Sequence, residues 1–450
     1  MSIALVILAA GKGTRMNSDL PKVLHPIAQA PMLVHAMRAG RALSPERTVI
    51  VAGHGAEAVT KAALAEDETA QVVLQEEQLG TAHAVDQARA ALDGFEGDVV
   101  VLYGDTPFLR PETLERMIAA RAGNDLVILG FDAADPARYG RLEMSGDKLE
   151  RIVEFKDASE EQRRISFCNS GLMACNAAVL FDLIAAVGND NASGEYYLTD
   201  VVELARARDL NVTAVACPEA ETLGVNSRAD LAQADAVFQT NARNALLDLG
   251  VTLMAPETVY LAADTVIGRD TVIEPNVVFG PGVTVESGTQ IRAFSHLEGC
   301  HVSRGAVVGP YARLRPGTEL AEDTKVGNFV EIKNAEIAEG AKVNHLSYVG
   351  DASIGARSNI GAGTITCNYD GFMKHRTEIG TGVFIGSNTM LVAPVTVGDG
   401  AMTATGTVVT RNVDPDALAV ARAKQENKPG YAKKLFSILR KKKENLSKGQ

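Results

Sequence analysis

The hydrophobic positions divide the chain into two halves with different periods. In the first half, short apolar runs (ALVILAA, TVIVAG, AQVVLQ and DVVVLYGD) alternate with stretches whose apolar residues recur at helical spacing, such as 32–43 and 111–122. Runs rich in Val, Ile and Leu and bounded by Gly or charge are typical of strands buried on both faces. Their alternation with helices predicts an α/β domain with a mostly parallel sheet.

In the second half, one apolar residue recurs every six positions, with a few slips of phase. A sustained hexapeptide period predicts a parallel β-helix, in which each hexad supplies one short strand and points its apolar residue into the core. A strand-rich sandwich is the structural alternative, but its turns would not recur every six residues. The recurring residues are Ile267, Ile273, Phe279, Val285, Ile291 and Leu297, then Val302, Val308, Leu314, Leu320, Val326 and Ile332, and finally Ile379, Ile385, Leu391 and Val397.

Between the halves, the segment 227–249 has the pattern of a single helix. Ser227 and Asp230 resemble a capping box, apolar residues at 231, 234 and 238 share one face, and Gly250 ends the segment. We therefore expect three parts: an α/β domain over residues 1–226, a linker helix over 227–250, and a repeat domain over 251–450 that ends in a basic tail.

The turn after the first strand has the composition of a phosphate-binding loop. In LAAGKGTRM, Gly11 and Gly13 let the backbone approach a ligand, backbone N–H groups can converge on an anion, and Arg15 and Lys22 add two cations. The segment matches neither the Walker pattern nor the dinucleotide fingerprint. The glycines alone would also fit an ordinary strand-to-loop turn.

Asp105 comes directly after another buried strand, in VVVLYGD. Open α/β sheets bind ligands at the carboxyl ends of their strands, and a hard carboxylate there suits Mg²⁺. Taken alone, Asp105 would also fit a turn residue before Thr106 and Pro107.

Composition and charge narrow the classes of function. Hydrophobic residues make up 46% of the chain and charged residues 22%, and the net charge of −12 argues against a general nucleic-acid binder. Residues 422–450 carry ten Lys or Arg against two Glu, which leaves −20 on the preceding residues. A solvated basic end is the favoured interpretation of this tail, and an anion-binding role is the alternative.

Five cysteines without a C-x-x-C pair indicate neither a disulfide framework nor a zinc site. The first apolar run is too short to span a membrane and lacks the basic lead-in of a secretory signal, so we expect a cytoplasmic protein.

The string LAAGKGTRM followed by PKVL resembles the sugar-1-phosphate nucleotidylyltransferases. The resemblance implies a Rossmann-like nucleotide-diphospho-sugar transferase domain, with Arg15 and Lys22 on the triphosphate and Asp105 and Asn226 holding Mg²⁺. It further implies that Gln75, Gly80 and Thr81 contact a uracil base, and that Gly140, Glu154 and Asn169 hold an N-acetylglucosamine moiety. The implied nucleotide and nucleotide-sugar site comprises Leu8, Ala9, Ala10, Gly11, Lys22, Gln75, Gly80, Thr81, Tyr103, Gly104, Asp105, Gly140, Glu154, Asn169 and Asn226.

The second half resembles the hexapeptide-repeat acyltransferases, whose left-handed parallel β-helices commonly associate as homotrimers. RLRPGTEL, VEIKNAEI, VNHLSYVGDASIG, TCNYDG and IGSNTMLVAP depart from the plain hexad. With these stretches, the chain from about Leu5 to Tyr431 resembles the family of bifunctional N-acetylglucosamine-1-phosphate uridylyltransferases/glucosamine-1-phosphate N-acetyltransferases. The resemblance implies UTP, acetyl-CoA, glucosamine-1-phosphate and N-acetylglucosamine-1-phosphate as substrates.

On this resemblance, His345 is the general base that takes a proton from the sugar amine, a task that suits imidazole near neutral pH. Neither Cys300 nor Cys367 shows a His-based activating pattern, which favours direct acetyl transfer over an acyl-enzyme. The implied sugar-phosphate contacts are Arg315, Lys333, Tyr348 and Asn359, and the implied acetyl-CoA contacts are Ala362, Asn368, Tyr369, Ser387, Thr405 and Arg422.

Two other functions compete with this one. One is a nucleotidylyltransferase for another sugar or base, with the β-helix as an oligomerising appendage. NHLSY and NYDG speak against it. The other is a noncatalytic subunit that keeps both folds as a scaffold, which the presence of Arg15, Lys22, Asp105 and His345 disfavours.

Overall fold

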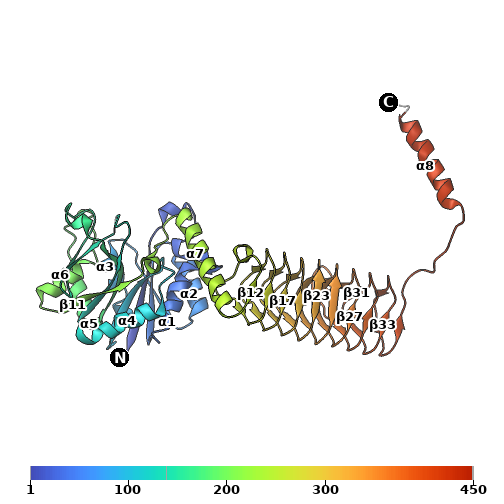
Figure 1. The fold of residues 1–450 in the computed structure, drawn as a ribbon, viewed down its shortest axis with the longest axis horizontal. Helices are drawn as coiled ribbons and strands as arrows, with labels where there is room; N and C mark the ends of the chain where they lie inside the picture. The colour runs from blue at the N-terminus through green and yellow to red at the C-terminus, as the bar shows by residue number, and fades with distance from the viewer. Residues whose placement is uncertain (1, 138, 448–450) are drawn as a thin grey trace. The chain divides into compact units, whose positions relative to one another are not determined.

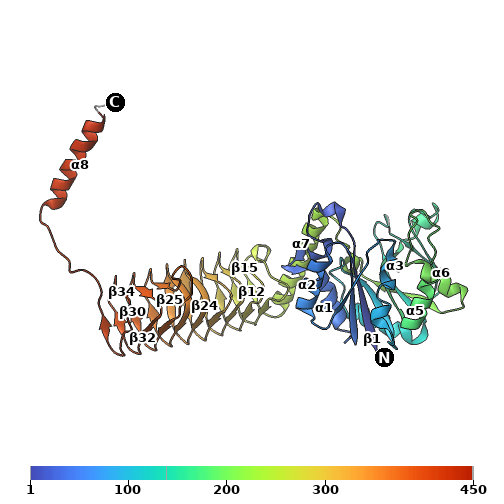
Figure 2. The same ribbon diagram turned by 180° about the vertical axis from the view of Figure 1, so that it is seen from behind.

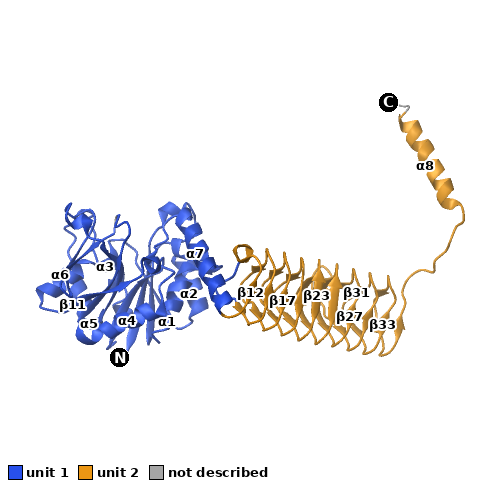
Figure 3. Cartoon of the chain, viewed as in Figure 1, with its two compact units in different colours: residues 1–248, 260–265 blue, residues 249–259, 266–450 orange. Residues whose placement is uncertain are grey.

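The computed structural model describes residues 2–137 and 139–447, which form two compact units (Figures 1 and 2). Residues 1–248 and 260–265 make up unit 1, and residues 249–259 and 266–450 make up unit 2 (Figure 3). Among the described residues, no helix is long and apolar enough to cross a membrane.

Unit 1 is built on one twisted sheet with the strand order β11-β7-β10-β6-β1-β4-β5. The pairs β1 with β4 and β6, β4 with β5, and β11 with β7 are parallel, whereas β10 runs antiparallel to both of its neighbours. The mostly parallel sheet expected from the sequence is confirmed. The strands are β1 (Ile3–Ala9), β4 (Arg47–Ala52), β5 (Gln71–Leu74), β6 (Asp98–Tyr103), β7 (Leu126–Asp132), β8 (Arg141–Ser145), β9 (Lys148–Val153), β10 (Phe167–Asn176) and β11 (Val212–Cys217), with the hairpin β2 (Pro26–Ile27) and β3 (Ala30–Pro31).

Helices cover both faces of this sheet and bury two apolar layers. One layer takes Val85, Leu180 and Val201 from α3, α5 and α6, and the other takes Leu33 and Leu114 from α1 and α4. The helices are α1 (Met32–Arg41), α2 (Ala56–Glu66), α3 (Thr81–Asp86), α4 (Pro111–Ala120), α5 (Ala177–Ile184), α6 (Asp200–Ala207) and α7 (Arg228–Asp248). The expectation that every apolar run is buried on both faces is wrong for β5, because β5 is the edge strand and its residues remain partly exposed.

Helix α7 begins with the expected capping box. Asp230 Oδ2 accepts the Ser227 backbone N–H at 2.9 Å, and Ser227 Oγ accepts the Asp230 backbone N–H at 3.2 Å. The same carboxylate accepts the Asn226 backbone N–H at 3.0 Å. This end of α7 therefore fixes Asn226, one of the predicted site residues, at the helix entrance.

Unit 2 is a parallel β-helix with three faces, and each coil pairs in register with the next. Ile273 lies beside Ile291 and Ile291 beside Val308, one coil apart. All sixteen apolar residues of the hexapeptide pattern are buried, so the predicted prism core is confirmed. One face comprises β12 (Thr252–Leu253), β14 (Val272–Ile273), β17 (Gln290–Ile291), β20 (Val307–Val308), β23 (Lys325–Asn328), β25 (Lys342–His345), β27 (Asn359–Ile360), β30 (Phe384–Ile385), β33 (Met402–Thr403) and β35 (Leu418–Ala419).

The two other faces are joined because β24 and β26 run around a corner of the prism and pair on both sides of it. The segment between β28 and β29, which contains most of the TCNYDG departure from the hexad, is an insertion into the coil. These faces comprise β13 (Val266–Ile267), β15 (Val278–Phe279), β16 (Thr284–Val285), β18 (His296–Leu297), β19 (Cys300–Val302), β21 (Arg313–Leu314), β22 (Thr318–Leu320), β24 (Glu331–Ile337), β26 (Tyr348–Ile354), β28 (Ile365–Cys367), β29 (Thr377–Ile379), β31 (Met390–Val392), β32 (Val395–Val397) and β34 (Val408–Val409). The last helix of the chain is α8 (Tyr431–Ser447).

Candidate functional sites

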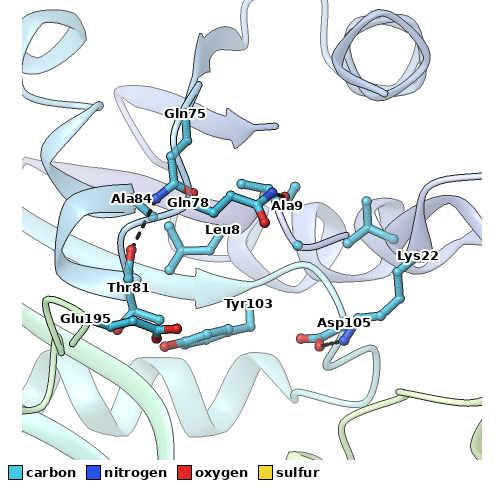
Figure 4. A pocket seen from close by; sticks show the side chains of 14 residues that line it. Leu8, Ala9, Lys22, Gln75, Gln78, Thr81, Ala84, Tyr103, Asp105 and Glu195 are labelled. Carbon is cyan, nitrogen blue, oxygen red and sulfur yellow. Dashed lines mark hydrogen bonds and ion pairs between the residues drawn. The ribbon is translucent and has the colours of Figure 1, made fainter. Parts of the chain in front are cut away.

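Unit 1 contains a pocket of about 360 Å³ at the carboxyl ends of β1 and β6 (Figure 4). Gln75 and Gln78 lie at one end of it, and Lys22 with Asp105 at the other. Ten of the residues predicted for the nucleotide site line this one pocket, so sequence segments far apart converge here. They are Leu8, Ala9, Ala10, Gly11, Lys22, Gln75, Gly80, Thr81, Tyr103 and Asp105, and the other lining residues are Val23, Gln78, Ala84 and Glu195.

The polar end of the pocket is organised around Lys22. Its ammonium group forms an ion pair with Asp105 and donates a hydrogen bond of 2.9 Å to Asn226 Oδ1. Arg15 donates to the same Asn226 oxygen at 2.9 Å. The two predicted phosphate-binding cations and the two predicted metal ligands therefore lie in one hydrogen-bonded cluster.

This cluster fits a divalent cation. The Asp105 carboxylate and Asn226 Oδ1 both contact the Lys22 ammonium, so a positive charge already lies between these two oxygen ligands. Mg²⁺ prefers oxygen ligands and commonly takes one or two from the protein and the rest from phosphate and water. Among residues 2–137 and 139–447 there is no group of three or more His, Cys, Asp or Glu placed to hold a metal ion. An ion between Asp105 and Asn226 would therefore be completed by substrate oxygens.

The opposite end of the pocket presents amide groups. The Gln75 side chain is buried, and its Nε2 donates to the Gly80 carbonyl at 3.2 Å and lies 3.1 Å from His83 Nδ1. No described residue donates a hydrogen bond to the Gln75 Oε1, which leaves that oxygen as an acceptor for a ligand. Gln78 Nε2 donates to the Ala10 carbonyl at 2.6 Å and so ties the glycine turn to this end of the pocket.

Gly140, Glu154 and Asn169, predicted for the sugar, do not line the pocket itself but lie together beside it. The Asn169 backbone N–H donates to the Gly140 carbonyl at 2.8 Å, and a Cβ at Gly140 would lie 3.5 Å from Glu154 Oε1. Burial raises the pKa of Glu154, and the nearby Asp157 carboxylate raises it further.

Tyr103 connects this group to the pocket. Burial raises the pKa of the Tyr103 phenol, and the carboxylates of Asp105 and Glu154 add to the effect. Tyr103 is therefore a neutral hydrogen-bonding group at neutral pH. Gly104, the remaining predicted residue, donates its backbone N–H to the Leu8 carbonyl at 3.0 Å and holds the ends of β6 and β1 together.

Glu195 is a pocket residue that the sequence did not single out. The Leu198 backbone N–H donates to Thr81 Oγ1 at 3.0 Å, and the Ala82 backbone N–H donates to the Tyr196 carbonyl at 3.0 Å. These bonds hold the segment 195–198 against the start of α3 and bring Glu195 into the pocket. The segment carries no motif of its own, so its placement is visible only in the folded chain.

In unit 2, the predicted acetyltransferase residues follow one corner of the prism. The carbonyls of His345, Ala362 and Ser387 each accept a backbone N–H from the next coil, at 3.2, 2.7 and 2.8 Å. Arg422 then donates from its guanidinium to the Thr405 carbonyl at 2.6 Å. Five predicted residues thus form one line along the corner, although up to 25 positions separate neighbours in the sequence.

His345 ends β25 and is exposed, with its Nδ1 3.0 Å from Asn328 Oδ1 on the preceding coil. Because an amide oxygen only accepts hydrogen bonds, this contact places the proton on Nδ1 and leaves the Nε2 lone pair available. Asn328 was not predicted from the sequence. Its position opposite His345 follows from the register of β23 and β25.

Around the same corner, Lys333, Tyr348 and Asn368 gather over Gly350. Lys333 is paired with Gly350 in register, and a Cβ at Gly350 would lie 2.4 Å from the Tyr348 hydroxyl and 2.8 Å from Asn368 Nδ2. Only glycine allows these two polar groups to approach so closely. Asn368 donates to the Asp351 carboxylate beneath.

Lys374 is a further cation that the sequence did not single out. It comes from the insertion after β28 and faces Lys333, and the proximity of that ammonium lowers the pKa of Lys374. Both lysines lie near Asp351, whose burial opposes ionisation but whose two amide donors, Asn334 and Asn368, lower its pKa below the usual range. Two like charges held together are typical of a site that binds an anion.

The remaining predicted residues of unit 2 surround this group. Arg315 forms an ion pair of 2.8 Å with Glu331, which is paired in register with Tyr348. Asn359 lies in β27, next to β25 on the face that carries His345. Tyr369 is 61% exposed, and its hydroxyl donates to the Gly371 carbonyl within the insertion.

All five cysteines are free thiols. Burial raises the pKa of Cys300 to about 12 and also raises the pKa of Cys367. Neither thiol is activated as a thiolate, which agrees with the preference for direct transfer.

Comparison with known proteins identifies both units. A family model described as a MobA-like NTP transferase domain matches residues 5–167, and one described as bacterial transferase hexapeptide (six repeats) matches residues 264–299. The chain is 83% identical over 448 residues to the bifunctional protein GlmU of Ruegeria pomeroyi, covering 100% of both chains. It is 60% identical over 443 residues to the bifunctional protein GlmU of Paracoccus denitrificans, covering 98% of this chain and 99% of that protein. With such similarity over the full length of both chains, the protein belongs to the family of bifunctional GlmU proteins.

Proposed function

We propose that the pocket of unit 1 transfers a uridylyl group from UTP to N-acetylglucosamine-1-phosphate, and that the His345 corner of unit 2 acetylates glucosamine-1-phosphate with acetyl-CoA. Membership of the GlmU family makes the chain a uridylyltransferase and an acetyltransferase. The proposal assigns each activity to particular side chains. The observation that carries it is the Lys22 cluster in unit 1, because it joins all four residues predicted to handle phosphate and metal.

In the acetyl transfer, the C2 amine of glucosamine-1-phosphate must attack as a neutral group. Its lone pair forms a bond to the thioester carbonyl carbon, and His345 Nε2 accepts the proton that the amine loses. The C–S bond breaks, and coenzyme A leaves as a thiolate that takes up a proton. Asn328 Oδ1 holds the imidazole in the tautomer that this step requires and stabilises the imidazolium.

Lys333 of β24 and Lys374 of the insertion after β28 bind the sugar phosphate. Lys333 and Lys374 face each other. The carboxylate near them, Asp351, already accepts hydrogen bonds from Asn334 and Asn368. A phosphate between the two ammonium groups relieves their repulsion. Along the corner, Ala362, Ser387, Thr405 and Arg422 supply a continuous surface for acetyl-CoA, with Arg422 suited to one of its phosphates.

In the uridylyl transfer, the attacking group is already an anion, so no general base is required. An oxygen of the sugar phosphate forms a bond to the α-phosphorus of UTP while the bond to the pyrophosphate oxygen breaks. Unit 1 supplies positioning and charge neutralisation. Lys22 and Arg15 move from Asp105 and Asn226 to the phosphates, because a triphosphate offers these cations more negative charge than one carboxylate does.

Mg²⁺ fits between Asp105 and Asn226, and when bound it supplies charge neutralisation on the triphosphate. The protein groups around it have a separate task. Gln75 Oε1 is available to accept the imide N–H of uracil, and the neutral Tyr103 and the Glu154 carboxyl are available to hydroxyl and amide groups of the sugar.

A reconstitution experiment tests both assignments. The purified protein is incubated with glucosamine-1-phosphate, acetyl-CoA, UTP and Mg²⁺, and free CoA, pyrophosphate and UDP-N-acetylglucosamine are measured. Omitting UTP is expected to stop pyrophosphate release but not CoA release. Omitting acetyl-CoA is expected to stop both, and adding N-acetylglucosamine-1-phosphate is then expected to restore pyrophosphate release alone. Equal activity with glucose-1-phosphate in place of the amino sugar would contradict the proposal.

We further propose that unit 2 associates as a homotrimer. Exposed aromatic side chains at one corner support this, because Phe294, Tyr311 and Phe329 stack in a ladder with ring centroids 4.9 and 5.2 Å apart. Their exposed fractions are 51%, 47% and 56%, an unusually large apolar surface for a free face. Sedimentation equilibrium is expected to give three times the 47.6 kDa chain mass, and a monomer would contradict the proposal.

The free cysteines support the further proposal of a reducing, cytoplasmic location.

A further inference from the structure

The amide of Gln75 is held in one orientation by groups behind the pocket of unit 1. Its nitrogen donates to the Gly80 carbonyl at 3.2 Å, and the same carbonyl accepts the Ala84 backbone N–H at 3.1 Å in the first turn of α3. A carbonyl only accepts hydrogen bonds, so the amide atom that faces it is the NH2 group, and the amide oxygen is left for a ligand in the pocket. Gln75 is only 4% exposed, so turning the amide over would press its oxygen against the Gly80 oxygen away from water.

His83 in α3 is a second group behind Gln75. Its Nδ1 lies 3.1 Å from the same Gln75 nitrogen, and its Nε2 lies 3.1 Å from the amide nitrogen of Gln87. The Gln87 nitrogen also donates to the His83 carbonyl at 3.0 Å, so it too is an NH2 group. Two NH2 groups therefore face the two ring nitrogens, although a neutral imidazole has an acceptor lone pair on only one of them.

The different surroundings of the two amides decide where the imidazole proton lies. Gln75 is buried and held by the Gly80 carbonyl, so it keeps its NH2 group toward the ring. Gln87 follows the last residue of α3 and is partly exposed, so its amide can turn its oxygen to the ring and its NH2 group to water. The proton therefore belongs on His83 Nε2, and the lone pair on Nδ1 accepts a hydrogen bond from Gln75.

We propose that His83 is the positioning residue that makes this pocket select uracil over cytosine, and that it acts through Gln75. The inference rests on the proposed function, in which Gln75 Oε1 accepts the imide N–H of uracil. Uracil carries a hydrogen on N3, whereas cytosine has a lone pair on the same atom, so the two bases require opposite ends of the amide. Two acceptors, the Gly80 carbonyl and His83 Nδ1, hold the NH2 end of Gln75 away from the base.

Cytosine is rejected in either orientation of this amide. With the amide as it stands, the N3 lone pair of cytosine meets the Gln75 oxygen, and the two acceptors repel each other. If the amide turned over to suit cytosine, the Gly80 carbonyl would lose the Gln75 donor and face an oxygen, and His83 Nδ1 would lose its donor as well. Buried acceptors that lose their donors are costly, and this cost becomes discrimination between the bases.

The ratio of kcat/KM with UTP to kcat/KM with CTP tests the proposal, with N-acetylglucosamine-1-phosphate as acceptor and pyrophosphate release as the measurement. His83→Leu removes the ring acceptor and is expected to lower this ratio about tenfold, the effect of one hydrogen bond to a buried group. His83→Asn places an amide oxygen near the position of Nδ1 and is expected to recover most of the ratio. Asp86→Asn is the control in the same helix, because Asp86 pairs with Arg89 and lies outside the pocket.

A double-mutant cycle measures whether His83 acts through Gln75. Gln75→Ala is expected to lower the ratio on its own, and adding His83→Leu to it should change the ratio no further, because no amide is left to orient. Every variant should keep the acetyl transfer of unit 2, which is measured as CoA release. His83→Phe keeps a planar ring without a ring nitrogen and gives the same test if His83→Leu lowers the melting temperature.

Two results would overturn the role of His83. Losses of equal size with UTP and CTP in His83→Leu and His83→Phe would mean that the imidazole only supports the fold. A change in the ratio that His83→Leu still causes in the Gln75→Ala protein would mean that His83 acts without Gln75. A wild-type protein with no preference for UTP would instead overturn the proposed uridylyl transfer and this inference with it, and that outcome is recognised before any variant is made.

Discussion

The two candidate sites are assembled in different ways. In unit 1, Lys22, Asp105 and Asn226 are separated by 83 and 204 positions and meet because strand ends and a helix entrance converge at one edge of a sheet. In unit 2, His345 and the acetyl-CoA residues meet because successive coils place them on one corner. The topology of the sheet brings the residues of the first site together, whereas the number of residues in each coil determines which residues of the second site lie side by side. A substitution in unit 1 is therefore expected to act on one cluster, and a substitution in unit 2 to act through the stacking of coils.

The largest effect is expected from Lys22→Ala. The change removes a cation from the developing charge of the pyrophosphate and leaves Asp105 without its ion pair. Uridylyl transfer should fall about 1,000-fold in kcat/KM while acetyl transfer stays unchanged. Pyrophosphate release and CoA release measure the two activities separately. Lys61→Ala, at an exposed lysine of α2, is the control, and a similar loss in that variant would remove the special role of Lys22.

Asn328→Ala should affect acetyl transfer alone. Without the amide oxygen at 3.0 Å, His345 loses the group that fixes its tautomer, and kcat should fall about 10- to 100-fold. Because Asn328 positions His345 and touches no substrate, KM for acetyl-CoA should stay unchanged. Asn328→Asp keeps an acceptor and should restore most of kcat with its pH profile displaced to higher pH. A loss confined to KM would contradict the assignment.

Lys374→Gln should weaken binding of glucosamine-1-phosphate about tenfold, within the range for one charge-assisted hydrogen bond. Arg376→Gln is the matched control, since it removes one charge from the same segment but Arg376 is paired with Glu336 at 3.1 Å. Because Lys333 lowers the pKa of Lys374, this cation is lost at lower pH than an ordinary lysine. The wild-type KM for the sugar phosphate should therefore rise at alkaline pH, and a pH-independent KM would contradict the pairing.

The smallest effect is expected from Asp200→Asn, on stability. Burial, together with the carboxylates of Glu203 and Glu154, raises the pKa of Asp200 to about 6. A raised pKa means that ionisation disfavours the folded state, so the wild-type chain loses stability as pH rises from about 4 to about 6. The variant avoids this loss and should melt at most a few degrees higher at pH 8, since partial exposure limits the gain to about 1 kcal/mol. At pH 4 the two should melt alike, and equal melting at both values would contradict the burial argument.

The same difference between the units explains what the sequence could predict. Every apolar residue that the hexad pattern named is buried in the structure, because one period determines the whole prism. The capping box at Ser227 was predictable because it is local. The edge position of β5, the entry of Glu195 into the pocket and the approach of Lys374 to Lys333 were not, because each depends on a connection whose path no local pattern encodes. Asn328 could have been found by counting back one coil from His345.

The most direct test of two separable sites is product analysis of Asp105→Ala and His345→Ala in the same mixture of glucosamine-1-phosphate, acetyl-CoA, UTP and Mg²⁺. Asp105→Ala is expected to release CoA and accumulate N-acetylglucosamine-1-phosphate without pyrophosphate. His345→Ala is expected to release neither CoA nor pyrophosphate. When N-acetylglucosamine-1-phosphate is added, it is expected to release pyrophosphate and form UDP-N-acetylglucosamine at the wild-type rate, still without release of CoA. UDP-sugar formation by Asp105→Ala, or wild-type acetylation by His345→Ala, would contradict the account.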